Sequence, residues 1–220
     1  MSQLPVNEIF PTLQGEANWA GTPALFVRFQ SCPIGCPWCD TKHTWNKLPQ
    51  NVVTVPEMLA KVADAPTYAN MDEDQLLMVI NDDKSSHVVL TGGEPAMYNL
   101  DELTRGIIGL GKTVQIETSG TFEIRVNHNT WVTLSPKIDM PGGYKVLASS
   151  VGLADEIKMV IGKMADVALL KDLLELRMDH PQIWLQPVSQ SPKSTAICID
   201  VARHHGWRVS IQTHRFLGIR

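Results

Sequence analysis

Short runs rich in β-branched and aromatic residues alternate with stretches of helical periodicity along most of the chain. Helical periodicity is found at 54–65, 71–80, 99–111, 164–178 and 193–206. The runs expected to form strands are 24–29, 87–91, 113–118, 131–135, 156–161, 183–188 and 208–213. This alternation is typical of an α/β domain with a mostly parallel sheet. We expect one domain over residues 1–220, with a loop at 66–72 between two helices.

Polar and glycine-rich motifs follow nearly every expected strand at its carboxyl end. They are the cysteine loop after 24–29, TGGEP (91–95), ETSG (117–120), SPK (135–137), QPVS (186–189) and QTHR (212–215). Ligands bind at the carboxyl ends of parallel strands, both in α/β barrels and in open sheets, so these motifs predict one shared site. Six or seven strands are too few for a closed eight-stranded barrel. The pattern favours a partial barrel that is open rather than closed.

Charge and hydropathy exclude several classes of protein. The net charge of -4 gives no electrostatic reason to bind nucleic acid. No uninterrupted apolar run approaches the roughly 20 residues that a membrane span needs. The start of the chain, MSQLPVNEIF, has neither the basic nor the apolar segment of a signal peptide. We therefore expect a cytoplasmic protein with no membrane anchor and no direct nucleic-acid partner.

The segment SCPIGCPWCDT holds three of the four cysteines, Cys32, Cys36 and Cys39. Cys198 stands apart in an apolar helical stretch, as expected of a small buried side chain. Clustered thiols in a reducing compartment indicate a metal. One interpretation is a zinc site with His43 as the fourth ligand. The other is a four-iron cluster held by three thiolates, which leaves one iron open to a further ligand. Zinc sites usually pair their cysteines as C-x2-C, which favours the cluster.

Arg28 interrupts the apolar run ALFVRF. A charge inside a buried strand needs a partner, because an unpaired buried charge is very costly. Either a structural salt bridge or an anionic ligand satisfies this requirement.

The C-x3-C-x2-C spacing, with Trp38 directly before the last cysteine, resembles the signature of radical S-adenosylmethionine (SAM) enzymes. The resemblance implies a [4Fe–4S] cluster whose open iron is chelated by SAM. In that family the reduced cluster cleaves SAM, and the resulting 5′-deoxyadenosyl radical abstracts hydrogen from the substrate. TGGEP is similar to the family's glycine-rich stretch, and the implied fold is a partial (β/α)6 barrel.

A longer set of motifs resembles the 7-carboxy-7-deazaguanine synthase family over nearly the whole chain: PTLQGE, FVRFQSC, CDTKHTW, TGGEP, IETSGT, SPK, LQPVSQ and QTHR. The resemblance implies a lyase that contracts the ring of 6-carboxy-5,6,7,8-tetrahydropterin to 7-carboxy-7-deazaguanine, with loss of ammonia, in queuosine and 7-deazapurine biosynthesis. It further implies a requirement for Mg²⁺, a flavodoxin- or ferredoxin-type reductant and a homodimer. Ala17 departs from the N-terminal motif, which often has glycine there.

The same resemblance assigns roles to individual residues. The cluster ligands are Cys32, Cys36 and Cys39, and Thr41 offers its hydroxyl to Mg²⁺. The SAM site is lined by Trp38, Cys39, Asp40, Gly93, Glu94, Ser119, Ser135, Pro136, Lys137 and Gln186. The substrate is held by Leu13, Gln14, Gly15, Glu16, Arg28, Thr91 and His214. Within this set, the guanidinium of Arg28 is suited to pair bidentately with the pterin carboxylate.

Two alternatives remain. A radical SAM activase that forms a glycyl radical on a protein partner has the same loop spacing, but such activases usually follow the last cysteine with His or Asn, whereas this chain has Asp40 and Thr41. A non-catalytic zinc or electron-transfer module explains the cysteines and leaves the other motifs without a role.

Overall fold

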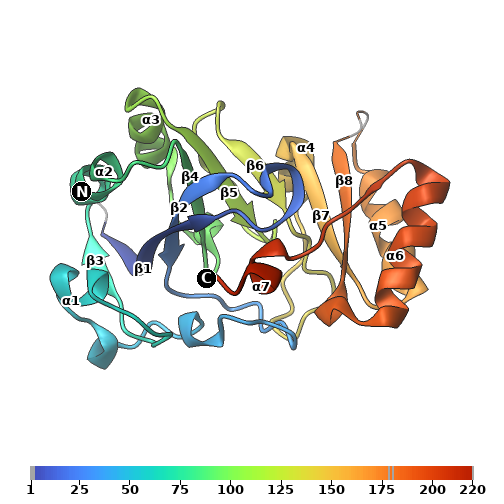
Figure 1. Ribbon diagram of the computed structural model, residues 1–220, viewed down its shortest axis with the longest axis horizontal. Coiled ribbons are helices and arrows are strands. Elements are labelled where there is room, and N and C mark those ends of the chain that lie inside the picture. The colour runs from blue at the N-terminus through green and yellow to red at the C-terminus, as the bar shows by residue number, and fades with distance from the viewer. Residues whose placement is uncertain (1–2, 178, 180, 220) are drawn as a thin grey trace.

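One nine-stranded sheet forms the centre of the computed structural model, which describes residues 3–177, 179 and 181–219 (Figure 1). The strand order is β3-β1-β2-β4-β5-β6-β7-β8-β9. The strands are β1 Leu4–Leu13, β2 Pro23–Phe29, β3 Ala69–Met71, β4 His87–Gly92, β5 Thr113–Thr118, β6 Trp131–Leu134, β7 Glu156–Ile161, β8 Gln182–Pro187 and β9 Arg208–Val209. Strand β1 is antiparallel to β2 and β3, and every pair from β2 to β9 is parallel. The sheet is therefore mostly parallel and open, with β3 and β9 at its edges.

Seven α-helices are found among the described residues: α1 Val55–Leu59, α2 Glu73–Asp82, α3 Asp101–Gly109, α4 Ala148–Leu153, α5 Met164–Leu174, α6 Pro192–His205 and α7 Thr213–Leu217. Short 3-10 turns lie at Ala17–Trp19, Lys42–Thr44, Pro49–Asn51, Pro95–Met97 and Val188–Gln190. Local sequence explains several helix ends. Thr54 and Glu57 form a capping box at the start of α1, and Gly206 ends α6 in the left-handed conformation.

Alternation along the strands separates an apolar face from a polar face. In β7, Ile157 and Ile161 are fully buried in the core, whereas Lys158 lies on the opposite face. In β2, Val27 joins the core and Arg28 points to the other side. The apolar face packs under the helices, in one cluster with α1, α2 and α3 and a second with α4, α5 and α6. The inner face of the curved sheet is left with the polar side chains.

Cys198 lies in the second of these clusters and is fully buried, as the sequence predicts. Among the described residues, no helix is long and apolar enough to cross a membrane.

The sheet has more strands than the six or seven expected. The N-terminal strand β1 was not predicted, because Pro5, Glu8 and Pro11 interrupt its hydrophobic pattern. The loop prediction at 66–72 is wrong in part, since Ala69–Met71 forms β3 and pairs with residues 4–6 of β1. A three-residue strand gives almost no periodic signal, so its partner decides whether it forms.

Several helix boundaries also differ from the prediction. The helix predicted at 54–65 ends at Leu59, because the chain turns back and the Lys61 ammonium donates to the carbonyls of Ala65 and Thr67. The strand predicted at 208–213 ends at Val209, and its last residue, Thr213, begins α7. Helix α5 ends at Leu174, and residue 178 of the predicted helix lies outside the described residues. Helix α4 was not predicted.

Candidate active site

A cavity of about 300 Å³ opens at the carboxyl ends of the parallel strands. It is lined by every residue to which the resemblance assigns a role except Pro136, which is buried beside Lys137. The sequence motifs therefore meet at one place, as their positions after successive strands predict. The further polar or charged residues in its wall are Glu117, Thr118, Lys158, Ser189, Gln212 and Arg215.

The three cysteines of the loop after β2 all line this cavity as free thiols. The loop is folded tightly, since the Cys39 amide donates to the Cys36 carbonyl at 3.1 Å and the Trp45 indole donates to the Cys39 sulfur at 3.3 Å. Burial raises the pKa of the Cys32 thiol to about 12 and also raises the pKa of Cys36. A bound cation reverses this preference, because it stabilises the thiolates.

The spacing of the cysteine sulfurs distinguishes the zinc interpretation from the iron–sulfur cluster. A zinc site needs at least three Asp, Glu, His or Cys side chains with their ligand atoms close together. Among the described residues, one such group has all its ligand atoms within 4.8 Å of one another, and it consists of Glu8, His43 and Asp64. The three cysteine sulfurs do not satisfy that limit. Two sulfurs on one tetrahedral zinc lie about 3.8 Å apart, because each Zn–S bond is about 2.3 Å. A multi-iron cluster spreads its thiolates further apart, so the loop fits a cluster with one open iron better than it fits zinc.

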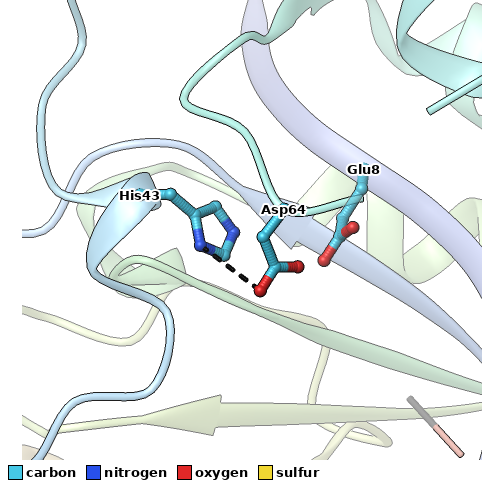
Figure 2. Close-up of side chains that lie close together, drawn as sticks. All are labelled: Glu8, His43 and Asp64. Carbon is cyan, nitrogen blue, oxygen red and sulfur yellow. Dashed lines mark ion pairs between the residues drawn. The ribbon is translucent and has the colours of Figure 1, made fainter. Parts of the chain in front are cut away.

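His43, the candidate fourth ligand in the alternative zinc interpretation, faces Asp64 and Glu8 (Figure 2). Its Nδ1 lies 3.9 Å from the Asp64 carboxylate. Glu8 in turn accepts a hydrogen bond from the Nε of Arg28 at 2.7 Å. The three cysteines and His43 therefore do not form a single zinc site. The Glu8 carboxylate near His43 is already paired with Arg28.

The TGGEP motif holds the cysteine loop against the sheet. The Gly93 amide donates to the Phe29 carbonyl at 2.9 Å, and the Glu94 amide donates to the Ser31 carbonyl at 2.8 Å. A Cβ at Gly93 would overlap the Ser31 carbonyl, so only glycine permits this approach.

The Glu94 carboxylate joins TGGEP to the loop after β5. It accepts hydrogen bonds from the Thr118 hydroxyl at 2.6 Å, the Ser119 amide at 2.9 Å and the Ala96 amide at 3.0 Å. Glu94 is 2 % exposed, and these donors engage both of its oxygens. Its carboxylate therefore fixes Ser119 in the cavity wall.

Lys137 and Asp40 lie at different depths around the cysteine loop. The Lys137 ammonium donates to the carbonyl and the hydroxyl of Ser135 at 2.8 and 2.6 Å, and burial lowers its pKa. The carboxylate of Asp40 is largely exposed and lies 3.7 Å from the Arg215 guanidinium, which extends from α7.

The opposite wall carries a network of charges that the sequence reasoning missed in part. The Lys158 ammonium pairs with Glu16 and lies 3.3 Å from the Glu117 carboxylate. Glu16 also accepts from the side-chain amides of Gln212 at 2.7 Å and Gln186 at 3.3 Å. Of these residues Glu16 and Gln186 were predicted, whereas Lys158, Glu117 and Gln212 were not. Lys158 interrupts the apolar run EIKMVI as Arg28 interrupts ALFVRF, so the same signal was present.

Helix α7 completes this side of the cavity. The amide and hydroxyl of Thr213 donate to the Gly15 carbonyl at 2.9 and 3.0 Å. The predicted residue His214 packs so closely on Gly15 that a Cβ there would overlap its imidazole.

Comparison with known proteins agrees with this geometry. A family model, the radical SAM superfamily, matches residues 26–139. The chain is 46 % identical to the 7-carboxy-7-deazaguanine synthase of Escherichia coli (strain K12) over 221 residues, which cover 99 % of both chains. It is 39 % identical to the enzyme of the same name from Buchnera aphidicola, over 98 % of this chain and 99 % of that one. The chain belongs to the 7-carboxy-7-deazaguanine synthase family.

A solved structure supports the same assignment. The crystal structure of QueE from Escherichia coli matches with a TM-score of 0.92 and 45 % sequence identity, covering 96 % of this chain and 94 % of that one. The expected radical SAM fold, α/β with an open and mostly parallel sheet, is confirmed. Membership of the 7-carboxy-7-deazaguanine synthase family makes the chain a radical SAM enzyme of the lyase class, for which a [4Fe–4S] cluster and SAM are the family's cofactors. The glycyl-radical activase and the zinc module are not favoured.

Proposed function

We propose that the chain converts 6-carboxy-5,6,7,8-tetrahydropterin to 7-carboxy-7-deazaguanine with loss of ammonia, in queuosine and 7-deazapurine biosynthesis. The observation that carries this proposal is one cavity lined both by the three cysteines of a radical SAM loop and by Arg28. Full-length relatives named for the same product support it.

On this proposal, Cys32, Cys36 and Cys39, which all line the cavity, would hold the cluster. When bound, the cluster and SAM supply the radical that removes a hydrogen atom from the substrate. The cofactor lies against Trp38, Asp40, Gly93, Ser119, Ser135, Lys137 and Gln186, which line the cavity around the cysteine loop. Glu94 and Pro136 act indirectly. Glu94 holds Ser119 in place, and buried Pro136 fixes the backbone between Ser135 and Lys137.

The substrate lies between Arg28 and the segment Leu13–Glu16. The Nε of Arg28 is engaged by Glu8, so the two terminal nitrogens of the guanidinium are directed to the substrate carboxylate. Thr91 pairs with Arg28 across β2 and β4 and lines the same wall. Gln14, Gly15 and His214 lie on the other side, where they contact the ring.

On the same proposal, the Thr41 hydroxyl would bind Mg²⁺ together with oxygens of the substrate. Thr41 lines the cavity, and its Oγ1 lies 3.6 Å from the Cys39 sulfur. A hard cation accepts one protein oxygen when substrate and water complete its coordination. When bound there, Mg²⁺ would supply positive charge that orients the substrate.

The test is an anaerobic assay of the reconstituted protein with SAM, a flavodoxin- or ferredoxin-type reductant, Mg²⁺ and 6-carboxy-5,6,7,8-tetrahydropterin. We expect one equivalent of ammonia for each 7-carboxy-7-deazaguanine, detected by mass spectrometry. Cleavage of SAM without a deazapurine product, using protein of full iron content, would contradict the proposal.

The remaining proposals concern organisation. Residues 1–220 act as one catalytic unit, which the single sheet through the described residues supports. We further propose a homodimer, as the resemblance implies. A mass of twice 24.4 kDa in light scattering tests this state.

A further inference from the structure

Gln115 lies behind the cavity wall, and none of the roles above uses it. It is fully buried in β5 and contacts Gln14, a residue of that wall. Its side-chain carbonyl accepts from the Gln14 side-chain amide at 3.2 Å and faces His87 Nε2 at 3.0 Å. Its NH2 group donates to the Thr133 hydroxyl at 2.7 Å. Gln115 therefore joins the cavity wall to polar residues deeper in the sheet.

The direction of the Gln115 amide is fixed from the side of Thr133. Thr133 has a single hydroxyl proton, which it donates to Glu156 Oε1 at 2.7 Å. The other oxygen of Glu156 accepts from the backbone amide of Asn18 at 3.1 Å, so both oxygens of this carboxylate act as acceptors. Because its proton is committed, the Thr133 oxygen is left to accept, and only the NH2 group of Gln115 can face it. The Gln115 carbonyl is thereby turned toward Gln14.

The Gln14 side chain is held at both ends of its amide. Its NH2 group donates to Gln115 and also to Glu117 Oε1, at 3.1 Å. Its carbonyl accepts from the backbone amide of Glu16 at 3.1 Å. A reversed Gln14 amide would place its NH2 group against the Glu16 amide, donor against donor. The orientation of Gln14 therefore holds the segment 14–16, which lines the cavity.

His87 depends on the direction of the same Gln115 amide. Since the Gln115 carbonyl can only accept, His87 Nε2 carries the ring proton, and Nδ1 accepts from the Thr113 hydroxyl at 2.8 Å. If Gln115 were reversed, Nε2 would accept and the proton would lie on Nδ1. Thr113 can accept from Nδ1, because its own proton can then go to the Ser86 carbonyl at 3.2 Å. The tautomer of neutral His87 thus depends measurably on how Gln115 points.

We propose that Gln115 is a positioning residue that holds Gln14 in the cavity wall, and that Thr133 and Glu156 fix the direction of its amide. The hydrogen bonds run from Gln14 through Gln115 and Thr133 to the buried carboxylate of Glu156. Within such a buried chain, each hydrogen bond strengthens its neighbours. The inference rests on the proposed function only because one of its two tests uses the pterin as the ligand.

The first test measures the affinity of the reconstituted, SAM-loaded enzyme for 6-carboxy-5,6,7,8-tetrahydropterin by calorimetry. Thr133→Val removes the acceptor of the Gln115 NH2 group, and we expect affinity to fall by about tenfold, as for loss of one hydrogen bond. Thr133→Ser keeps the hydroxyl and should bind as wild type does. Thr104→Val is the matched control, because the Thr104 hydroxyl is also fully buried but donates to the Leu100 carbonyl in α3. It should lower the melting temperature and leave affinity unchanged.

A double-mutant cycle tests whether the effect passes through Gln14. Gln14→Met should itself weaken binding, since it removes the side-chain amide. Adding Thr133→Val to Gln14→Met should then cost less than about twofold in affinity, against about tenfold for Thr133→Val alone. Gln115→Met should give the same pattern, and it replaces Thr133→Val if that variant does not bind its cluster.

The second test measures the tautomer of His87 and needs no activity. Nitrogen-15 NMR of the histidine-labelled, reconstituted protein at roughly pH 8 distinguishes a protonated from an unprotonated ring nitrogen, and His87→Gln assigns the signal. Burial lowers the pKa of His87, so the ring is neutral under these conditions. We expect the proton on Nε2 in wild type and in Thr133→Ser. In Thr133→Val we expect a second population with the proton on Nδ1.

The outcomes distinguish this inference from the proposed function. If wild type neither binds nor converts the pterin, the proposed function fails, and the tautomer of His87 decides whether Thr133 directs Gln115. The positioning role is overturned if Thr133→Val keeps wild-type affinity or if its effect adds fully to that of Gln14→Met. It is equally overturned if His87 keeps its proton on Nε2 alone in Thr133→Val.

Discussion

The guanidinium of Arg28 forms a salt bridge within the fold, and the residue also lines the cavity. Its Nε donates to Glu8, the residue opposite in β1, and its carbon lies 5.7 Å from the centre of the Phe10 ring. The structural salt bridge, one of the two interpretations from the sequence, is present, and the anionic ligand stays a prediction. Arg28 also lines the cavity, so the same side chain is available to an anionic ligand there.

Substituting Arg28 with Lys separates the two roles. An ammonium can pair with Glu8, but it cannot also make a planar two-point contact with a carboxylate. We expect Arg28→Lys to retain its cluster and its melting temperature, while substrate affinity falls by roughly 30- to 1,000-fold, equal to about 2–4 kcal/mol. Calorimetry and thermal unfolding measure the two quantities. Arg28→Gln serves as the comparison, since it should also lower the melting temperature. Unchanged affinity in the Lys variant would assign Arg28 to the fold alone.

Replacing a cysteine of the loop should remove the cluster, whereas replacing Cys198 should not. Removing one of the three thiolates leaves too few ligands for the cluster, so Cys32→Ala, Cys36→Ala or Cys39→Ala should abolish it. Cys198→Ala is the matched control, because that thiol is buried in the core and should keep the full iron and sulfide content. Iron analysis and the visible spectrum of anaerobic protein provide the measurement. A colourless wild-type protein with one zinc per chain would refute the assignment.

Thr41 offers a test of Mg²⁺ that leaves the cluster in place. If its hydroxyl is a ligand, Thr41→Ala should raise the Mg²⁺ concentration needed for half-maximal turnover by about tenfold, with the visible spectrum intact. Thr41→Ser should behave as wild type, because it keeps the hydroxyl. An unchanged Mg²⁺ response in the Ala variant would place the ion elsewhere.

At the scale of elements, the end of β4 packs closely against the start of the cysteine loop. Gly93→Ala should destabilise the protein by more than about 2 kcal/mol, since the added methyl overlaps the Ser31 carbonyl next to Cys32. Iron content should fall with it. Gly109→Ala in α3 is the control, because nothing lies within 4 Å of its Cβ position. That variant should change stability by at most about 1 kcal/mol. Denaturant unfolding compares the two variants, and equal effects would contradict this account.

Strands that contain a continuous apolar run were predictable from the sequence. Elements whose bounds depend on contacts with a distant segment were not. The strands β2, β4, β5, β6, β7 and β8 each contain an apolar run and were predicted nearly to their ends. Strand β3 forms because it pairs with Leu4–Val6 of β1. The local sequence at 69–71 does not indicate this pairing. Likewise α1 ends early because Lys61 binds carbonyls of the turn that follows.

At the scale of the whole molecule, polar side chains fill the inner face of the curved sheet. His87 stacks on Trp19 at 4.3 Å, its Nδ1 meets the Thr113 hydroxyl at 2.8 Å, and its Nε2 meets the Gln115 side chain at 3.0 Å. Gln14 donates to Gln115 and to Glu117, which links this layer to the cavity above it.

Burial of His87 predicts sensitivity to acid. Burial lowers its pKa below the ordinary 6.5, although Gln115 and Glu117 oppose the shift. The unfolded chain therefore binds the proton first as pH falls. Stability is complete above about pH 7 and falls below it, by at most about 1.4 kcal/mol per pH unit for this one group. His87→Gln should reduce the slope between pH 7.5 and 5.5 in urea unfolding of the cluster-free protein. Exposed His128→Gln should leave it unchanged, and an equal slope in all three proteins would exclude His87 as the cause.

The sequence predicted the position of the cavity better than it predicted the residues that hold the cavity wall together. Cysteine spacing and the motifs after each strand located the cavity, because parallel strands end at a common edge. Lys158 was missed although the run around it resembles that around Arg28. Gln212 carries no such signal, since its partner Glu16 lies 196 positions away in the chain. Contacts of that separation depend on the completed fold.

The hydrogen bonds from Thr213 to Gly15 span 198 positions, so one wall of the cavity depends on the two ends of the described chain coming together. During synthesis the three cluster thiols leave the ribosome early, before Lys137, Lys158 or His214 exists. The last wall of the cavity closes only when α7 reaches the loop after β1. A chain that stops before α7 would therefore carry all three cluster thiols but lack the part of the cavity wall that His214 and Arg215 form.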